Sequence, residues 1–312
     1  MVAAVPASGL LIESSRGITA NMPPTLSLVT PSFNQAQFIG ATFDSVFAQN
    51  YPALDYVVVD GGSNDGSREL ISARSGQLAW WCSEPDRGMY DALNKGFAHT
   101  RGEIMGWLNS DDLLLPGALR AIGEIFDRFP DVQWLSSLTL STWTPTGNCS
   151  GIATIEGFSN AAFLEGGYLP GGGRHYGWIP QESTFWRRKL WEKAGGCVDA
   201  SLKLAGDYEL WSRFFRHAEL TGTPTPLGGF RTHAAQKSRA LDDYLTEAHR
   251  VTNTAAQLAT HRTNMMRWLL QRSRVADIPG IRGMCARNIG YSARRVVATA
   301  EGGWRAENYR FL

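Results

Sequence analysis

The chain has 312 residues, of which 43% are hydrophobic and 19% are charged. This composition supports a large buried core and excludes collagen, coiled-coil and low-complexity proteins. The 30 basic and 29 acidic residues leave a net charge of +1. A protein dedicated to nucleic acid normally carries a basic excess, so we expect no nucleic-acid partner.

The charge differs between parts of the chain. From Leu241 to Leu312 there are 11 Arg and 6 acidic residues, so this segment is basic and the rest is mildly acidic. Residues 1–23 show no hydrophobic periodicity, and Met22-Pro-Pro marks their end. We therefore expect a flexible lead-in over 1–23, one α/β domain over 24–240 and a basic helical extension over 241–312.

The four cysteines are too far apart in the sequence for a zinc knuckle or a redox motif, and we expect buried free thiols. They are Cys82, Cys149, Cys197 and Cys285. The sequence has no basic and apolar leader, and no apolar run approaches the ~18 residues of a membrane-spanning helix. These patterns predict a cytosolic protein.

Strand-like apolar runs alternate with helical patterns in the first half of the chain. Strands are predicted over 26–30, 56–59, 79–82 and 103–108, and helices from Asn34 as N-cap, over 67–73, over 89–99 and from Pro116. Strands about 25 residues apart with helices between them indicate βαβ crossovers. The predicted fold is an α/β sandwich related to the Rossmann fold, with a mainly parallel central sheet.

Later segments carry weaker patterns. A strand is predicted over 132–140, a glycine-rich mobile loop over 166–177, a helix over 206–218 and a last strand over 229–232. Helices are expected from Leu241 onward.

Two segments of the expected extension, beginning at Asn264 and Ile289, mix apolar residues with arginine as interfacial helices do. They predict possible peripheral contact with the inner face of the plasma membrane. Helices that pack on the domain with arginine outward are an equally good explanation.

Polar side chains follow the predicted strands. They are Thr30, Asp60, Glu84, Asp111 and Asp112. Ligands of parallel sheets bind at the carboxyl ends of the strands, so these residues predict one shared crevice.

Asp111 and Asp112 are adjacent carboxylates directly after a strand. A hard divalent cation that carries a diphosphate takes one or two carboxylates as ligands, so this pair indicates a metal site. Helix capping is the alternative, although it needs only one carboxylate.

Asp60 opens a Gly-rich turn that lacks the glycine spacing of a dinucleotide-binding fold. Its carboxylate can accept a hydrogen bond from a base or a ribose, and a plain turn is the alternative.

Four motifs follow one another in the chain: Thr30-Pro-Ser-Phe-Asn, Val59-Asp-Gly-Gly-Ser-Asn-Asp-Gly-Ser, Ser83-Glu-Pro-Asp-Arg-Gly-Met-Tyr-Asp-Ala-Leu-Asn-Lys-Gly and Leu108-Asn-Ser-Asp-Asp. The ordered set closely resembles the family 2 glycosyltransferases of GT-A fold, over about Leu26 to Ser238. The resemblance implies inverting transfer of a sugar from a nucleotide diphosphate sugar to an acceptor hydroxyl, with Mg2+ or Mn2+ as cofactor.

The resemblance also implies roles for individual residues. Donor-binding positions are Thr30, Pro31, Asn34, Asp60, Ser63, Glu84, Asp86, Arg87, Asp91, Asn94, Lys95, Asn109, Asp111 and Lys237. Asp112 stands at the metal position of a DXD-like motif, and Asp111 and His233 would complete the metal shell. Asn109 departs from the Asp that many members carry, which leaves its role open.

Ala205-Gly-Asp-Tyr-Glu-Leu-Trp-Ser-Arg resembles the family segment that carries the general base, usually as the second of two acidic residues. Asp207 matches that second acid, and a carboxylate near a helix N-terminus is expected to stay ionised and accept a proton. A plain N-cap role for Asp207 is the alternative. Glu209 should point elsewhere and is a poorer candidate.

Ile179-Pro-Gln-Glu-Ser-Thr-Phe-Trp-Arg-Arg resembles the acceptor side of the family, so Gln181, Glu182 and Trp186 are expected acceptor contacts. The acceptor is expected to be a saccharide or a lipid-linked saccharide of cell-surface glycan assembly.

A nucleotidyltransferase is one alternative function, but the loop after the first strand lacks the Gly and basic residues that bind a triphosphate. A non-catalytic nucleotide-binding scaffold is the other. The sequence gives no indication of the oligomeric state.

Overall fold

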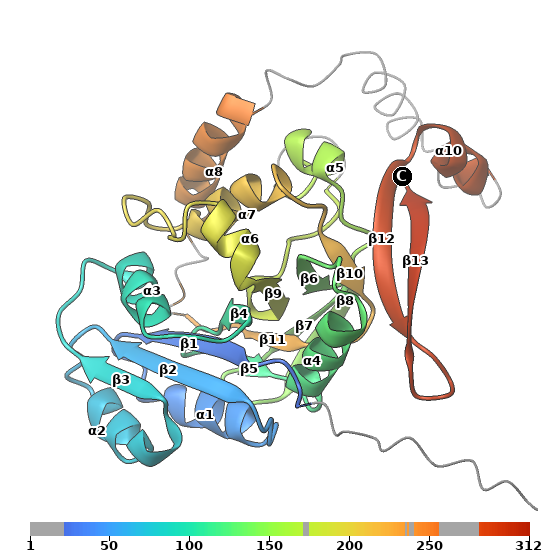
Figure 1. Ribbon diagram of the computed structural model, residues 1–312. Helices are drawn as coiled ribbons and strands as arrows, with labels where there is room; N and C mark the ends of the chain where they lie inside the picture. Colours follow the sequence, from blue (N-terminus) through green and yellow to red (C-terminus); the bar gives the residue numbers. More distant parts are fainter. Residues whose placement is uncertain (1–21, 171–174, 235, 237–239, 256–280) are drawn as a thin grey trace, which may run out of the picture.

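The computed structural model describes residues 22–170, 175–234, 236, 240–255 and 281–312. Within these residues, nine strands form the central sheet in the order β13-β12-β10-β6-β9-β4-β1-β2-β3 (Figure 1). Its strands are β1 (Leu26–Ser32), β2 (Leu54–Asp60), β3 (Trp80–Ser83), β4 (Ile104–Trp107), β6 (Trp134–Ser137), β9 (Thr184–Arg187), β10 (Thr221–Thr223), β12 (Tyr291–Ala298) and β13 (Trp304–Phe311). Only β9 and β13 pair antiparallel to their neighbours, which confirms the predicted mainly parallel sheet.

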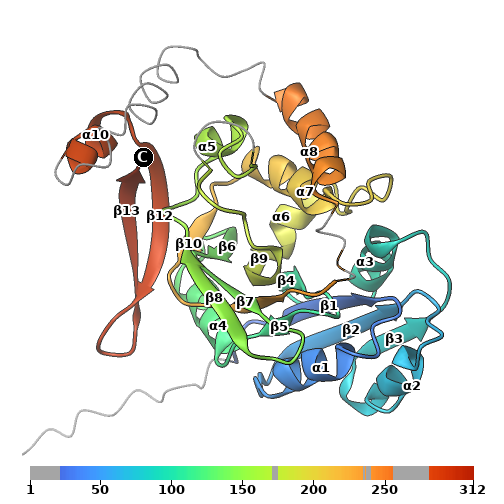
Figure 2. The same ribbon diagram turned by 180° about the vertical axis from the view of Figure 1, so that it is seen from behind.

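Helices cover both faces of the sheet (Figures 1 and 2). They are α1 (Ile39–Phe47), α2 (Ser67–Ser72), α3 (Met89–Ala98), α4 (Ala118–Arg128), α5 (Asn160–Leu164), α6 (Arg188–Lys193), α7 (Gly206–Phe215), α8 (Leu241–Ala255) and α10 (Ile281–Ile289). Two short 3-10 turns occupy Ser75–Gln77 and Gln181–Ser183.

Two hydrophobic cores lie on opposite faces of the sheet because successive strand residues point to opposite sides. In β2, Val57 and Val59 join the core formed with α3, α6 and α7. Tyr56 and Val58 join the second core, formed with α1, α2 and α4. The alternation of fully buried residues fixes the register of the strand, because a shift by one residue would exchange the two faces.

A small second sheet brings the end of a late strand to the end of β4. Its order is β5-β11-β7-β8, formed by β5 (Leu113–Leu114), β11 (Gly228–Arg231), β7 (Thr139–Trp143) and β8 (Cys149–Thr154). β11 pairs antiparallel with β5, which directly follows the Asp111 and Asp112 turn. Residues more than 110 positions apart in the sequence are thereby placed beside each other.

The structure corrects two boundaries of the predicted elements. The first helix begins at Ile39, and Asn34 adopts a left-handed φ of 53° in the preceding loop instead of capping the helix. The expected extension over 241–312 is helical only in part. Residues from Tyr291 form the β12–β13 hairpin, which lengthens the sheet at its edge (Figure 1).

The hairpin also bears on the expected membrane contact. The segment from Ile289 was expected to be an interfacial helix, but its residues from Tyr291 alternate between buried and more exposed positions in β12. The segment from Asn264 lies outside the described residues. No helix in the described part of the chain is long and apolar enough to span a bilayer.

The expectation of buried thiols was wrong. Cys149 and Cys197 are exposed, and Cys82 and Cys285 are partly exposed. All four are free, as predicted from their spacing.

Candidate active site

Asp60 fixes the turn that follows β2. Its Oδ2 accepts hydrogen bonds from the Ser63 backbone N–H at 2.9 Å and the Ser83 hydroxyl at 2.7 Å, and its Oδ1 accepts one from the Ser63 hydroxyl at 2.5 Å. The side chain is 0% exposed. The structure thus contradicts direct contact between this carboxylate and a base or ribose, because burial leaves no approach to it. Asp60 acts by shaping the turn.

The turns after β1 and β2 are held together by side-chain to backbone hydrogen bonds. The Ser63 hydroxyl accepts a bond from the Asn34 N–H at 2.8 Å, and the Asn34 side-chain oxygen accepts one from the Asn64 N–H at 3.1 Å. Asp65 accepts a further bond from the Ala36 N–H at 2.9 Å. The predicted residues Asn34 and Ser63 therefore meet at one rim of the carboxyl edge.

Thr30 and Pro31 are buried in β1, contrary to the expectation that their side chains hold the base. The Thr30 hydroxyl bonds that of Tyr56 at 2.9 Å. Phe33, two residues further, is 60% exposed and was not predicted as a site residue. A Cβ on Gly61 would lie 3.2 Å from the Phe33 ring, so the glycine permits the ring to lie against the Asp60 turn. The signal in the sequence was an aromatic residue directly after a strand.

Charged residues on and before α3 form a linked cluster beside this rim. Lys95 Nζ lies 3.1 Å from Glu84 and 3.8 Å from Asp91, and Arg87 pairs with Asp91 at 2.6 Å. Asp86 accepts a bond from the Gly88 N–H at 2.7 Å. The structure brings these five predicted residues together, with Arg87 82% and Glu84 58% exposed.

Asn94 has a different role from the predicted donor contact. Its side-chain amide donates to the Val198 carbonyl and accepts from the Val198 N–H, both at 2.8 Å. Both polar atoms of the amide are occupied, so Asn94 ties α3 to the segment before α7.

Asp111 and His233 meet at the carboxyl end of β4. Asp111 Oδ2 lies 2.9 Å from His233 Nε2, and the two side chains are 18% and 7% exposed. The His233 ring packs on Phe38 with ring centroids 4.5 Å apart. The predicted convergence of these two residues, 122 positions apart, is therefore present in the structure.

Asp112 points into the protein. It is 1% exposed, its Oδ1 accepts a bond from the Arg231 N–H at 3.0 Å, and its Oδ2 accepts one from the Asn109 amide at 3.3 Å. Burial raises the pKa of Asp112 well above its ordinary value, and the charges of Asp111 and Glu182 add to the shift. The structure contradicts Asp112 as the principal metal ligand, because Asp111 is the more accessible of the two.

Arg231 at the end of β11 was missed by the sequence analysis. Its guanidinium lies 5.3 Å from the centroid of the Phe38 ring, and burial lowers the pKa of this group while Asp112 and Asp111 oppose the shift. The Arg231 Nε is buried and has no hydrogen-bond partner. A basic residue near the end of the predicted strand over 229–232, two positions before His233, was the available signal.

The donor atoms near Asp111 suit a divalent cation that also binds a diphosphate. Asp111 and His233 supply oxygen and nitrogen, and the buried Asn109 Oδ1 has no partner. In the described ranges, no three His, Cys, Asp or Glu side chains form a metal-binding group. A cation here would therefore take much of its coordination from the ligand's phosphate oxygens, as Mg2+ usually does.

Asp207 lies in the first turn of α7, where the N-cap is Ala205. The alternative of a plain N-cap is therefore wrong. Asp207 Oδ1 accepts bonds from the Tyr208 N–H at 2.7 Å and the Tyr244 hydroxyl at 3.4 Å. Burial raises the pKa of Asp207 to about 6, so the carboxyl is easier to protonate than the helix-terminus argument alone predicted.

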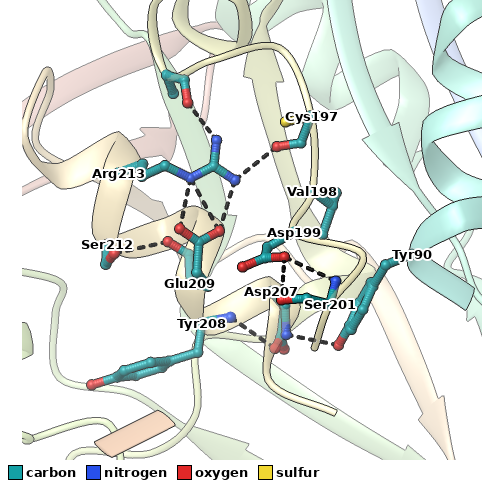
Figure 3. A network of polar contacts seen from close by, with 12 residues as sticks. Tyr90, Cys197, Val198, Asp199, Ser201, Asp207, Tyr208, Glu209, Ser212 and Arg213 are labelled. Carbon is teal, nitrogen blue, oxygen red and sulfur yellow. Dashed lines mark hydrogen bonds and ion pairs between the residues drawn. The ribbon is translucent and has the colours of Figure 1, made fainter. Parts of the chain in front are cut away.

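Glu209 points away from Asp207, as expected. It forms an ion pair with Arg213 at 2.7 Å, and Arg213 also donates to the carbonyls of Ala194 and Cys197 (Figure 3). Figure 3 shows the Glu209 and Asp207 side chains directed to different sides of α7.

Gln181 and Glu182 lie in the short 3-10 turn Gln181–Ser183, beside the end of β4. The Gln181 amide donates to the Trp107 carbonyl at 2.7 Å, and Gln181 Oε1 accepts from Asn109 at 3.1 Å. Glu182 is 4% exposed, and burial raises its pKa to about 7 with a further contribution from the Asp207 charge. Glu182 also contributes to the shift of Asp112. The carboxyls of Asp112, Glu182 and Asp207 thus form one electrostatic group, although the burial of Glu182 contradicts its direct contact with an acceptor.

Trp186 is a core residue, which contradicts its predicted contact with the acceptor. It is 0% exposed, and its ring packs edge-on against Trp107 and Trp211 at centroid distances of 5.6 and 5.8 Å. The expected position of Lys237 lies outside the described residues.

We predict that Trp186→Ala lowers the free energy of unfolding by about 3–5 kcal/mol, because it leaves a large cavity. Trp186→Phe should cost less, since the buried indole N–H has no partner and its removal is favourable. Urea unfolding measures both. The partly exposed Trp304 provides the control, as Trp304→Ala should be milder. A small loss of stability in Trp186→Ala, together with a raised KM for the acceptor, would instead support contact between Trp186 and the acceptor.

The chain is similar to known glycosyltransferases in sequence and in fold. The sequence profile of Glycosyl transferase family 2 matches residues 27–138. The uncharacterized glycosyltransferase Rv1514c of Mycobacterium tuberculosis is 32% identical over 191 residues, which cover 60% of this chain and 67% of that protein. The chain belongs to glycosyl transferase family 2. Another relative, the uncharacterized glycosyltransferase RP339 of Rickettsia prowazekii, is 25% identical over 72% of this chain and 69% of its own length.

Solved structures show that the fold is that of GT-A glycosyltransferases. S. aureus TarS 1-349 in complex with UDP-GlcNAc aligns with a TM-score of 0.59 at 13% identity, over 80% of this chain and 73% of that one. The mannosyltransferase PcManGT from Pyrobaculum calidifontis, in complex with GDP-Man and Mn2+, aligns with a TM-score of 0.50 at 16% identity, over 84% and 83%. A longer TarS structure is matched over 44% of its length.

Proposed function

We propose that this glycosyltransferase moves a sugar from a nucleotide diphosphate sugar to an acceptor hydroxyl with inversion, and that Asp207 is the general base. The observation that carries the proposal is the position of Asp207. Its partly buried carboxyl has a pKa of about 6 and interacts electrostatically with Glu182, which in turn interacts with Asp112 beside the Asp111–His233 pair. A carboxyl that titrates near the working pH suits a general base.

The donor is proposed to lie along the carboxyl ends of β1, β2 and β4. Phe33 offers an exposed ring to a base, beside the turn shaped by Asp60. Lys95 and Arg87 offer positive charge near this rim. The TarS and PcManGT structures are complexes with UDP-GlcNAc, UDP or GDP-Man, which supports a nucleotide-sugar donor.

Mg2+ or Mn2+ is proposed as the cofactor, held by Asp111 and His233 together with the donor diphosphate. When bound, such a cation opposes the negative charge that develops on the leaving diphosphate. The chain itself holds His233 by ring packing on Phe38, and it places the Arg231 guanidinium on the same ring, close to Asp111 and Asp112. These contacts keep the two candidate ligands within hydrogen-bond distance of each other.

The acceptor is proposed to approach from the side of Gln181 and Asp207. Inversion follows because the acceptor oxygen attacks the anomeric carbon opposite to the leaving diphosphate, and Asp207 takes the hydroxyl proton as the new bond forms. A saccharide or lipid-linked saccharide of cell-surface glycan assembly is the proposed acceptor, with the reaction in the cytoplasm. Membrane contact remains proposed only through the segment that begins at Asn264.

A panel of UDP-, GDP- and dTDP-sugars with Mn2+ tests the proposal. Slow release of the nucleoside diphosphate from one donor is expected, because water can replace the acceptor. Nucleotide binding without any release would favour the non-catalytic scaffold. Release of pyrophosphate from a nucleoside triphosphate and a sugar phosphate would instead favour a nucleotidyltransferase.

The pH dependence of turnover follows from the raised pKa of Asp207. Only the ionised carboxylate accepts a proton, so kcat/KM should be constant above about pH 7 and fall about tenfold per unit below pH 6. An ordinary exposed Asp, with a pKa near 4, would keep its activity down to about pH 5. Measurement of kcat/KM between pH 5 and 8 distinguishes the two cases. A flat profile to pH 5 would exclude Asp207 as a base with this pKa.

A further inference from the structure

The residues just before α7 have backbone N–H groups that need a hydrogen-bond acceptor from outside the helix. The N-cap residue, Ala205, has no side-chain acceptor for them. Glu247 of α8 takes this role, since its carboxylate accepts bonds from the N–H groups of Lys203 at 3.1 Å, Leu204 at 2.9 Å and Ala205 at 3.0 Å. One side chain, 42 residues further along the chain, therefore fixes the three residues before Gly206 and Asp207.

Tyr90 of α3 holds the same segment from the opposite end. Its hydroxyl donates to the Leu204 carbonyl at 2.5 Å and accepts from the Gly206 N–H at 2.9 Å. A Cβ on Gly206 would lie 2.6 Å from the Tyr90 ring, which is too close for any side chain. This close contact explains why a glycine stands at position 206. The space is filled by Tyr90.

Tyr244 lies one helical turn before Glu247 on α8, so the two side chains share a face of the helix. The Tyr244 hydroxyl donates to Asp207 Oδ1 at 3.4 Å, and its ring packs edge-on against Trp178 with centroids 5.6 Å apart. α8 thus contacts both the segment before Asp207 and the Asp207 carboxylate itself. Figure 1 shows α8 beside α7.

We propose that α8 is a positioning element for the general base, in which Glu247 fixes the backbone that carries Asp207 and Tyr244 orients its carboxylate. The inference rests on the proposed function for its consequence in catalysis. Both residues, like Asp207 itself, lie outside residues 27–138, the part that the family profile matches.

The charge state of Glu247 agrees with this role. Burial alone would raise its pKa, but the bonds from the Ala205, Leu204 and Lys203 N–H groups lower the pKa below its ordinary value. Glu247 is therefore ionised at neutral pH, and charge-assisted bonds to backbone N–H groups are stronger than neutral ones.

Two variants separate the contributions of Glu247 and Tyr244. Hydrogen exchange and NMR titration measure these contributions without enzyme turnover. In Glu247→Gln, hydrogen exchange of the Lys203, Leu204 and Ala205 amides should accelerate about tenfold or more, since the charged acceptor is lost. In Tyr244→Phe, carbon NMR of the Asp207 carboxyl should show its titration midpoint raised by about half a pH unit, because a donor to the ionised form is removed. In active enzyme, both variants should lower kcat about tenfold at unchanged donor KM.

Glu219→Gln is the matched control. Glu219 also accepts a backbone N–H, that of Asn160 at 3.0 Å, but it lies outside α8 and the Asp207 segment. The control should leave the exchange, the titration and kcat unchanged. Unchanged exchange in Glu247→Gln, or an unmoved titration in Tyr244→Phe, would overturn the positioning role. Failure of the proposed function would appear separately, as an inactive wild-type protein that still shows both effects.

Discussion

Asp207→Asn is expected to lower kcat for sugar transfer by about 10²- to 10⁴-fold while the donor still binds with its original affinity. The amide has nearly the shape of the carboxyl but cannot accept the acceptor's proton. Calorimetric binding of the donor and single-turnover transfer measure the two parts separately. Full transfer by this variant would end the assignment of the base.

The same substitution should stabilise the fold. A carboxyl whose pKa is raised in the folded state favours folding only while it is protonated, so stability declines as the pH rises from about 4 through 6. At pH 7 the cost is about 2–3 kcal/mol, since the pKa rises from 3.8 to about 6. The uncharged Asn avoids this cost, and the melting temperature should rise by a few degrees. Such a gain in stability on replacement is expected of a catalytic residue whose charge destabilises the fold.

Glu209→Gln is the control for Asp207→Asn. Glu209 occupies the same first turn of α7 but pairs with Arg213 on another side of the helix. Its replacement should leave kcat within a few-fold of the wild-type value and should not raise the melting temperature. An equal loss of transfer in both variants would show that negative charge at the helix N-terminus, and not proton acceptance by Asp207, is what matters.

Asp111→Ala is expected to weaken Mn2+-dependent donor binding by about 10- to 100-fold or more. Loss of a residue that only hydrogen-bonds to a metal ligand already lowers metal affinity by about that factor, and loss of the ligand itself should lower it at least as much. His233→Ala should act in the same direction because the two side chains lie 2.9 Å apart. Titration calorimetry with and without Mn2+ provides the measurement. The exposed Asp44, paired with Arg74 on the surface, supplies the control Asp44→Ala, which should bind the donor normally. Donor binding by Asp111→Ala that still depends fully on Mn2+ would contradict the proposed ligand.

The alternation of strands and helices was predictable because its signals are local. Apolar runs such as Tyr56 to Val59, followed by Gly-rich turns, specify a buried strand and its end without knowledge of the rest of the chain. The carboxyl-end rule then placed Asp60 and Asp111 along one edge, and the family resemblance added His233. The β12–β13 hairpin was missed because its arginines suggested an amphipathic helix, although Val296, Val297 and the Gly302-Gly303 turn favoured strands.

The errors in the site concern burial, which sequence patterns do not report. Asp112 and Asp111 are adjacent, and only the packing of β11 decides that Asp112 faces inward. Trp186 lies in a segment that resembles an acceptor side, but strand alternation places its ring in the core. The support of Asp207 by Glu247 spans 40 residues, and such long-range contacts leave no periodic signal.

The most direct test of the central claim is the melting temperature of the wild-type chain with each nucleotide sugar and Mn2+. A ligand that binds only the folded state stabilises it by about 2.7 kcal/mol at a hundredfold excess over its Kd. One donor class should raise the melting temperature by several degrees, and the rise should vanish in Asp111→Ala. If no nucleotide sugar shifts the wild-type melting temperature, the carboxyl edge of the sheet is not a nucleotide-sugar site. An equal shift in Asp111→Ala would instead contradict Asp111 as a ligand of the cation.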